Sequence, residues 1–201
     1  MKLDGQNIEP RGSLLETILA SGIDLPHLCK DDNLPVIGAC RTCLVEADGR
    51  IVAACSTPAE SVSECTTSSE RATRIRRGVL ALTAAMQGPG ADSLTGGPCS
   101  GEARAAFTAH QVESHRLPVR TSSHTDTSNT FFSFHEDACI LCGRCTTACQ
   151  DLQHIGAIGI AGRGQRARVT PGAGVAFADS VCTSCGSCVA ACPTTALSPR
   201  E

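Results

Sequence analysis

Twelve of the fourteen cysteines fall into three groups of four, and their spacing constrains the fold more than any other feature of the sequence. Two groups, CILCGRCTTAC at residues 139–149 and CTSCGSCVAAC at residues 182–192, share the spacing C-x2-C-x2-C-x3-C. Three thiolates at i, i+3 and i+6 can surround one corner of a [4Fe–4S] cube. Where two such motifs occur together, the last cysteine of each motif binds the cluster of the other.

This crossed arrangement predicts the ligands of two [4Fe–4S] clusters. The two sets are Cys139, Cys142, Cys145 and Cys192, and Cys182, Cys185, Cys188 and Cys149. Gly143 and Gly186 let the backbone approach the cluster sulfides. Pro193, directly after the last cysteine, is typical of two-cluster ferredoxins. Gln150, directly after the last cysteine of the first motif, departs from that pattern. The alternative is zinc, which usually takes its four sulfurs from two separated C-x2-C pairs. Two uninterrupted quartets favour iron–sulfur clusters.

The third group lies near the N-terminus and has the spacing C-x10-C-x2-C-x11-C. Its members are Cys29, Cys40, Cys43 and Cys55. Plant-type [2Fe–2S] ferredoxins keep the same central C-x2-C pair, after a shorter first gap and before a distant fourth cysteine. We therefore expect one [2Fe–2S] cluster here. His27, two residues before the first cysteine, is an alternative ligand or hydrogen-bond donor, but four cysteines already complete the site, so we expect a surface or packing role.

Local signals around this group predict a β-grasp scaffold. Asp-Gly pairs at residues 4–5 and 48–49 predict the turns of two hairpins, because this dipeptide favours type I′ turns. Ser13 and Glu16 form a capping box at the start of a helix predicted over residues 13–22.

The predicted fold class is α+β. We expect an N-terminal β-grasp [2Fe–2S] ferredoxin-like domain at residues 1–80 and a C-terminal two-cluster [4Fe–4S] ferredoxin-like domain at residues 131–201. Residues 81–130 are Gly-, Ser- and Thr-rich in two stretches and are predicted to be a linker, with a short helix within residues 101–113. Residues 157–172 are predicted to form a hairpin between the two [4Fe–4S] motifs.

Composition bears on the compartment. The chain has no Trp, no Tyr and only five Phe, so its cores are thin and need metal or covalent support. Disulfides would fit an extracellular protein, but the polar N-terminal segment does not look like a signal peptide, and no run approaches the ~18 apolar residues of a membrane span. We therefore expect a cytoplasmic protein without a membrane span, in which thiols stay reduced and bind metal.

Charge and motifs exclude other functions. A net charge of −3 argues against nucleic acid as a partner. The basic cluster of Arg71, Arg74, Arg76 and Arg77 is expected to be a solvated helix face, or alternatively a surface for an acidic partner. The sequence contains no dinucleotide or phosphate-binding fingerprint and no nucleophile–base pair in a supporting context. We expect no catalytic residue and no cofactor-binding residue beyond the cluster ligands.

Taken together, the motifs HLC, GACRTC, AAC, CILCGRCTTACQD and CTSCGSCVAACP resemble the electron-transfer module of complex-I-related enzymes. That module is the iron–sulfur diaphorase subunit of NAD-reducing [NiFe] hydrogenases. It is also the N-terminal part of the large subunit of NAD-dependent formate dehydrogenases, and it occurs in [FeFe] hydrogenases and in complex I. The resemblance covers about residues 1–80 and 131–201, and all twelve motif cysteines match ligand positions of the family.

The middle of the chain departs from that family. Its members usually hold a further [4Fe–4S] cluster there with one His followed by three cysteines, whereas this chain has only Cys99, and His110 lies after it. We expect that this cluster has been lost. Cys65 and Cys99 lie outside every motif and are expected to be packed or incidental thiols.

The resemblance implies an electron-transfer subunit. It would relay electrons between a catalytic formate dehydrogenase or hydrogenase subunit and a flavin/NAD(P)-binding subunit. One alternative is a freestanding multi-cluster ferredoxin, although such carriers are usually single small domains. A second alternative is an iron–sulfur redox sensor, but the sequence has no DNA-binding element. The terminal substrate stays open at this point.

Overall fold

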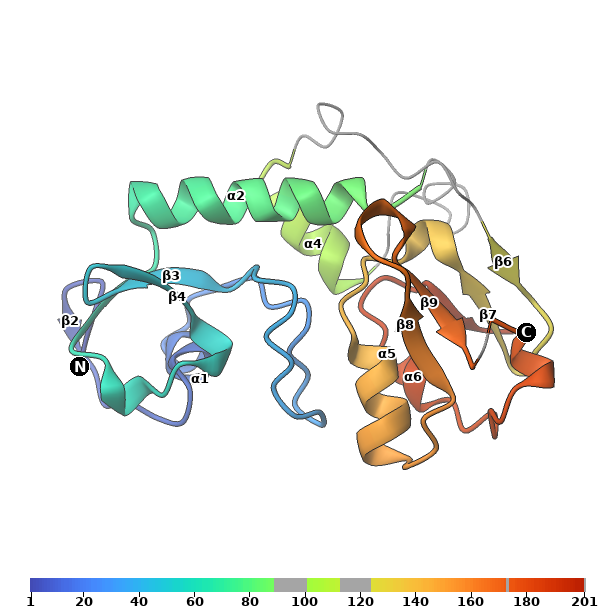
Figure 1. Ribbon diagram of the computed structural model, residues 1–201. Coiled ribbons are helices and arrows are strands. Elements are labelled where there is room, and N and C mark those ends of the chain that lie inside the picture. The colour runs from blue at the N-terminus through green and yellow to red at the C-terminus, as the bar shows by residue number, and fades with distance from the viewer. Residues whose placement is uncertain (89–100, 113–123, 173, 201) are drawn as a thin grey trace.

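The computed structural model describes residues 1–88, 101–112, 124–172 and 174–200 and shows two α+β halves (Figure 1). One long helix, α2 (Glu70–Ala85), runs from the N-terminal half towards the C-terminal half. The predicted fold class is confirmed. None of the helices in the described ranges is long and apolar enough to cross a membrane.

The N-terminal half contains a five-stranded sheet in the order β2-β1-β5-β3-β4. Its strands are β1 (Lys2–Leu3), β2 (Gln6–Asn7), β3 (Leu44–Ala47), β4 (Arg50–Ala53) and β5 (Glu64–Thr66). β1 and β5 pair in parallel, and the other neighbours pair antiparallel. Helix α1 (Leu14–Ala20) packs on this sheet, and Leu14, Ile18 and Val45 are fully buried between them.

The local predictions for this half are confirmed. Both residues of each predicted turn have positive φ, 47° and 84° at Asp4-Gly5 and 45° and 74° at Asp48-Gly49, as type I′ turns require. At the start of α1, Ser13 Oγ accepts a 3.2 Å hydrogen bond from the backbone N–H of Glu16. In return, Glu16 Oε2 accepts a 2.8 Å bond from the N–H of Ser13. The capping box is therefore present.

Helix α2 corrects two predictions. The expected domain boundary at residue 80 falls inside the helix, because Leu80, Thr83 and Ala85 continue its buried face. Past its last turn, the Gln87 side chain donates a 3.1 Å hydrogen bond to the carbonyl of Ala138, and the N–H of Gly88 donates a 2.8 Å bond to the carbonyl of Asp137. The helix thus ends against the residues that precede the first [4Fe–4S] motif.

The second correction concerns the basic cluster. Arg71, Arg74 and Arg77 are exposed as expected, but Arg76 is only 6% exposed. Its Nη1 donates hydrogen bonds of 2.8 and 3.0 Å to the carbonyls of Leu44 and Thr67. These bonds to strand-end carbonyls offset part of the cost of burial, and burial still lowers the pKa of Arg76. The charge pattern along the helix does not reveal these distant carbonyls.

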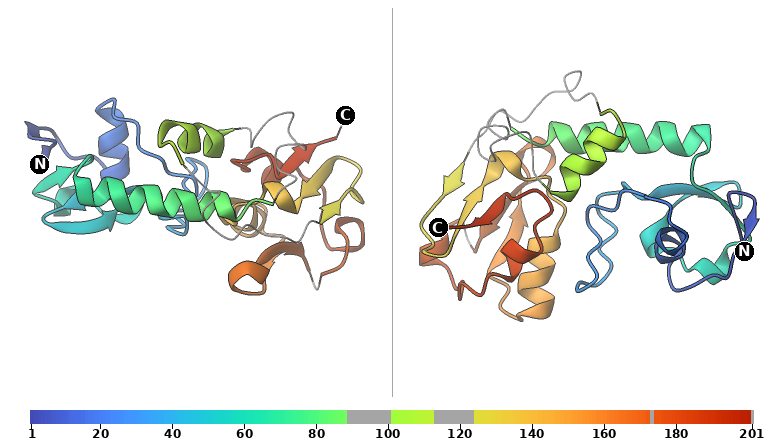
Figure 2. Two further views of the ribbon diagram at one scale, coloured as in Figure 1. Left: turned by 90° about the horizontal axis from the view of Figure 1, so that it is seen from above. Right: turned by 180° about the vertical axis from the view of Figure 1, so that it is seen from behind.

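Helix α4 (Glu102–Ala109) confirms the short helix predicted within residues 101–113 and lies beside the C-terminal part of α2 (Figure 2). Strand β6 (Thr125–Asp126) belongs to the C-terminal sheet. The segment expected to be a linker therefore contains a helix and a strand. Residues 89–100, including Cys99, and residues 113–123 lie outside the described residues.

The C-terminal half contains a three-stranded sheet, β10-β7-β6, and the predicted hairpin, β8-β9. The further elements are β7 (Phe132–His135), β8 (Ile158–Ala161), β9 (Arg168–Pro171), β10 (Leu197–Pro199), α5 (Arg144–Thr147) and α6 (Ser187–Ala190). Helix α5 continues into a π-helical turn at Ala148–Leu152. Single 3-10 turns occur in both halves, at Ala54–Ser56 and Ala59–Ser61 in the first and at Glu136–Ala138, Gly164–Arg166 and Phe177–Asp179 in the second. Phe132 and Phe177 meet edge to face at 5.1 Å in a core that also contains Cys139, Cys145 and Cys149.

Candidate iron–sulfur sites

The four N-terminal cysteines come together at one end of the β3-β4 hairpin. Cys43 directly precedes β3 and Cys55 follows β4, so strand pairing brings them close. The N–H of Cys29 donates a 3.3 Å hydrogen bond to the sulfur of Cys40. The thiol of Cys29 also contacts that of Cys55, which contacts that of Cys43.

These contacts divide the four thiols into two whose pKa is lowered and two whose pKa is raised. The pKa of Cys29 is strongly lowered because the thiols of Cys40 and Cys55 donate hydrogen bonds to it, and the pKa of Cys43 is lowered by the thiol of Cys55. The pKa values of Cys40 and Cys55 are raised, since these thiols keep the protons that they share. Thiolate is the form of cysteine that binds metal.

The first C-terminal motif includes α5, and its four cysteines are buried. Burial raises the pKa of Cys142 to about 12, with smaller contributions from the charges of Cys192 and Cys139. Burial also raises the pKa of Cys145, and the charges of Cys139, Cys142, Cys192 and Cys188 raise it further. The last cysteine of the second motif therefore lies beside the first three cysteines of the first motif.

In the second motif, three cysteines lie beside the last cysteine of the first motif. Burial raises the pKa of Cys188 to about 12, and the charges of Cys182, Cys185 and Cys149 raise it further. These four cysteines line one cavity together with Phe132, Ile155, Ala157, Ile158, Thr183 and Gly186. Cys149, from the first motif, thus faces the three cysteines of the second. These neighbourhoods are those that crossed ligation requires, and the ligand assignment itself stays a prediction.

The two motifs repeat the same backbone conformation. Leu141 and Gly143 have φ of 55° and 84°, and the equivalent Ser184 and Gly186 have φ of 58° and 79°. This turn points a backbone N–H at the first sulfur of each motif: Leu141 donates to Cys139 and Ser184 donates to Cys182, both at 3.4 Å. Clusters use such N–H···S bonds, and donor sets made only of cysteine suit iron–sulfur clusters. The residues present therefore fit these groups.

Within the described part of the chain, no three His, Cys, Asp or Glu side chains converge closely enough to hold one ion. Iron–sulfur clusters distribute their thiolates over several iron atoms, so their ligands surround a larger space.

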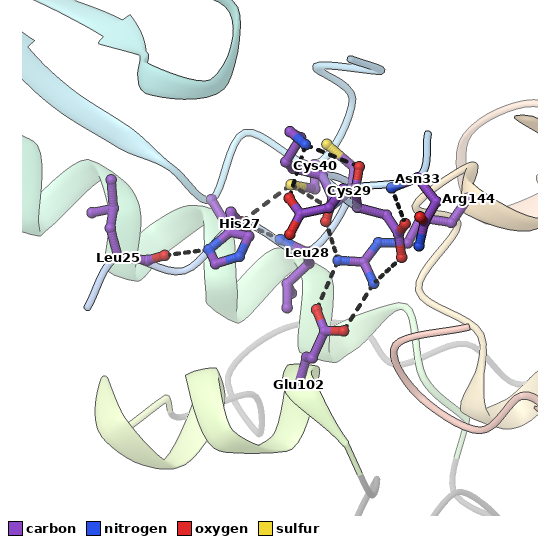
Figure 3. A network of polar contacts seen from close by, with 12 residues as sticks. Leu25, His27, Leu28, Cys29, Asn33, Cys40, Glu102 and Arg144 are labelled. Atoms are coloured by element: carbon purple, nitrogen blue, oxygen red, sulfur yellow. Dashed lines mark hydrogen bonds and ion pairs between the residues drawn. The ribbon is translucent and has the colours of Figure 1, made fainter. Parts of the chain in front are cut away.

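The N-terminal site and the first C-terminal motif adjoin one another. Cys29 and Cys142 belong to one buried cluster with Leu28, Leu80, Ala103, Ala106 and Ile140. Between them lies Arg144, only 2% exposed, paired with Glu102 of α4 (Figure 3). Sequence reasoning missed both residues. The one available signal was a charged residue inside a metal-binding motif, the Arg of CGRC.

His27 and Cys65 lie outside the three sets of cysteines. The Nδ1 of His27 lies 2.6 Å from the carbonyl oxygen of Leu25, and the ring is partly buried beside a cavity that His110 also lines. Burial lowers the pKa of His110. Cys65 is fully buried in the N-terminal core, and burial raises its pKa to about 12, so the prediction of a packed thiol is confirmed.

Comparison with known proteins finds two kinds of iron–sulfur domain in this chain. Residues 1–70 match a 2Fe-2S iron-sulfur cluster binding domain, and residues 138–196 match a 4Fe-4S dicluster domain. The crystal structure of an NAD+-reducing [NiFe]-hydrogenase in the H2-reduced state contains a chain that is 28% identical. It superposes with a TM-score of 0.84, covering 100% of this chain and 86% of that one.

Curated relatives are longer proteins. A putative formate dehydrogenase, YrhE of Bacillus subtilis, is 32% identical over 209 residues, which is 98% of this chain and 21% of that protein. One of the NADH-quinone oxidoreductase subunits of Escherichia coli is 30% identical over 161 residues, which is 74% of this chain and 17% of that protein. The chain thus spans about a fifth of the length of these relatives. The predicted resemblance is confirmed.

Proposed function

Because the chain joins a 2Fe-2S cluster-binding domain to a 4Fe-4S dicluster domain, we propose that it is an electron-transfer subunit of a multi-subunit, NAD-linked oxidoreductase. Bound iron–sulfur clusters accept and release single electrons. The chain would relay electrons between a formate- or hydrogen-handling subunit and a flavin/NAD(P)-binding subunit. We place it in the cytoplasm, where the exposed Cys185 and the half-buried Cys40, Cys182 and Cys192 would stay reduced.

We propose one [2Fe–2S] and two [4Fe–4S] clusters. The ligand sets are Cys29, Cys40, Cys43 and Cys55; Cys139, Cys142, Cys145 and Cys192; and Cys182, Cys185, Cys188 and Cys149. The thiol neighbourhoods described above support each set. The protein's own part is to supply thiolates, to aim backbone N–H groups at them, and to exclude water from the middle set.

The proposal of an electron relay rests on the spatial order of the three cysteine sets. The first C-terminal set adjoins the N-terminal set through the buried cluster of Leu28 and Ile140, and Cys142 and Cys145 are buried. In the second C-terminal set Cys185 is exposed. A relay needs a site at each end that a partner can approach, and the least buried cysteines of the two outer sets are the exposed Cys185 and the partly buried Cys40. We propose that the N-terminal domain faces the flavin subunit and the dicluster domain faces the catalytic subunit.

The test is anaerobic co-purification of the tagged chain from its native host, followed by activity assays. We expect a flavin-bearing and a metal-bearing partner. A Cys55→Ser change should abolish formate- or hydrogen-driven NAD reduction and leave formate- or hydrogen-driven dye reduction largely intact. Cys185→Ser should also abolish this NAD reduction but leave NADH-driven dye reduction largely intact. Cys65→Ser, at a buried cysteine outside the sets, is the matched control.

Two results would contradict the proposal. If the effects of Cys55→Ser and Cys185→Ser are exchanged, the orientation is reversed. If the chain purifies with full iron content and without partners, a freestanding ferredoxin is the better assignment.

A further inference from the structure

Arg144 is a buried cation at the contact between two proposed cluster sites. It lies between Cys142 and Cys145 at the first position of α5, and its side chain is 2% exposed. A guanidinium in such a position is costly unless its charge and its N–H groups are compensated. Its partners therefore indicate which parts of the structure it joins.

Those partners come from two other segments (Figure 3). Nη1 and Nη2 donate to the two carboxylate oxygens of Glu102 at 3.0 and 2.7 Å, a two-point contact with helix α4. Nη2 also donates to the carbonyl of Lys30, directly after Cys29, and Nη1 lies 3.8 Å from a carboxylate oxygen of Asp31. One side chain thus connects the first [4Fe–4S] motif, the [2Fe–2S] loop and α4.

Glu102 is itself held against the dicluster domain. The N–H of Ala103 donates a 3.3 Å hydrogen bond to the carbonyl of Pro193, the residue after Cys192. Gly101 packs so closely on the same carbonyl that a Cβ atom would lie 2.8 Å away. The backbone on both sides of Glu102 is therefore held against the dicluster domain, although the Glu102 side chain is half exposed.

The positive charge of Arg144 lies close to the motif cysteines. Arg144 is between Cys142 and Cys145 in sequence, and its side chain is buried with theirs. The potential of an iron–sulfur cluster depends on nearby charge, because reduction adds a negative charge that a cation stabilises. Glu102 offsets part of this effect.

We propose that Arg144 is a positioning residue that holds the [2Fe–2S] loop against the first [4Fe–4S] motif, and that the balance between Arg144 and Glu102 sets the reduction potential of the cluster bound there. This inference rests on the proposed function. The step that it serves moves one electron from a reduced cluster to its oxidised neighbour, and no bond forms or breaks.

The test is a redox titration of the purified full chain, followed by EPR. Glu102→Gln removes the balancing carboxylate, so the midpoint potential of the first [4Fe–4S] cluster should rise. Arg144→Gln removes the cation, so the potential should fall, and Arg144→Lys should restore it towards wild type. The double variant Glu102→Gln/Arg144→Gln should lie between the two single variants. Damage to the structure alone would not produce shifts of opposite sign.

The exposed pair of Glu9 and Arg11, 3.7 Å apart and far from the cysteines in sequence, offers matched controls. Glu9→Gln and Arg11→Gln should leave every potential unchanged. The inference is overturned if Glu102→Gln keeps its iron and shows no upward shift, or if both single variants shift the potential in the same direction. Wild-type protein without iron would instead overturn the proposed function, so the two failures are distinguishable.

Discussion

Gly101 lies directly against Pro193: a Cβ atom at position 101 would come within 2.8 Å of the carbonyl oxygen of Pro193. Gly101 also has φ of +83°, which only glycine adopts without strain. A Gly101→Ala change should therefore cost about 2–3 kcal/mol of unfolding free energy, from backbone strain and from the displaced helix. Urea denaturation measures this loss. Gly22→Ala is the control, because Gly22 has a similar φ of +78° but open space around it; equal losses would contradict the close contact.

Iron content tests the number of clusters. Anaerobically purified protein should contain about ten irons per chain, two from the [2Fe–2S] cluster and eight from the two cubes. Metal analysis with acid-labile sulfide determines this directly. A value near fourteen would mean that a third cube exists, and stoichiometric zinc would contradict the iron assignment.

Crossed ligation makes an unusual mutational prediction. Cys149→Ser should disturb the cluster held by residues 182–188, and Cys192→Ser should disturb the cluster held by residues 139–145. EPR of each reduced variant, compared with wild type, identifies the altered signal. The arrangement of ligands is wrong if each substitution affects only the motif in which it lies.

Arg76 and Arg77 are neighbours in sequence with opposite environments. Arg76→Met leaves two strand-end carbonyls without their buried donor and should lower the unfolding free energy by about 2–4 kcal/mol. Arg77→Met removes an exposed charge and should change it by less than about 0.5 kcal/mol. Thermal melts of the two variants make the comparison. Similar losses would show that Arg76 is not anchored as described.

The buried thiol of Cys65 should make the free energy of unfolding depend on pH. Burial raises its pKa from the ordinary value of 9.0 to about 12, so its contribution to stability is fully present below pH 9 and is lost between pH 9 and about 12. The stability difference between wild type and Cys65→Ala should be smaller at pH 10 than at pH 8. The stability lost in Val45→Ala, at a buried residue that does not titrate, should be the same at both values. Urea midpoints of the three proteins test this, and a constant difference for Cys65→Ala would contradict it.

The parts of the fold that depend on neighbouring residues could be predicted from the sequence. The Asp-Gly turns and the Ser13–Glu16 capping box are complete within a few residues, so their chemistry is visible in the chain itself. The grouping of cysteines was also predictable, because fixed intervals around tight turns bring sulfurs to one side of the backbone.

The rest depends on partners that are distant in sequence. Arg76 is buried because the carbonyl of Leu44, 32 residues earlier, accepts its hydrogen bond. Arg144 is paired with a carboxylate 42 residues away, on a helix inside a segment whose composition indicates a linker. Charge and composition along the chain do not reveal which exposed-looking residue tertiary packing will enclose.

Helix α2 begins over the N-terminal sheet and ends against the residues that precede the first [4Fe–4S] motif. Each half would expose apolar surface if its part of the helix were removed. A gene segment cut at residue 80 would divide this helix and leave its buried residues exposed in both products. A fragment that ends at residue 80 should therefore be less stable than one that ends after residue 88, where the helix is complete. The span recurs almost whole in a much longer putative formate dehydrogenase and in a hydrogenase chain of similar length.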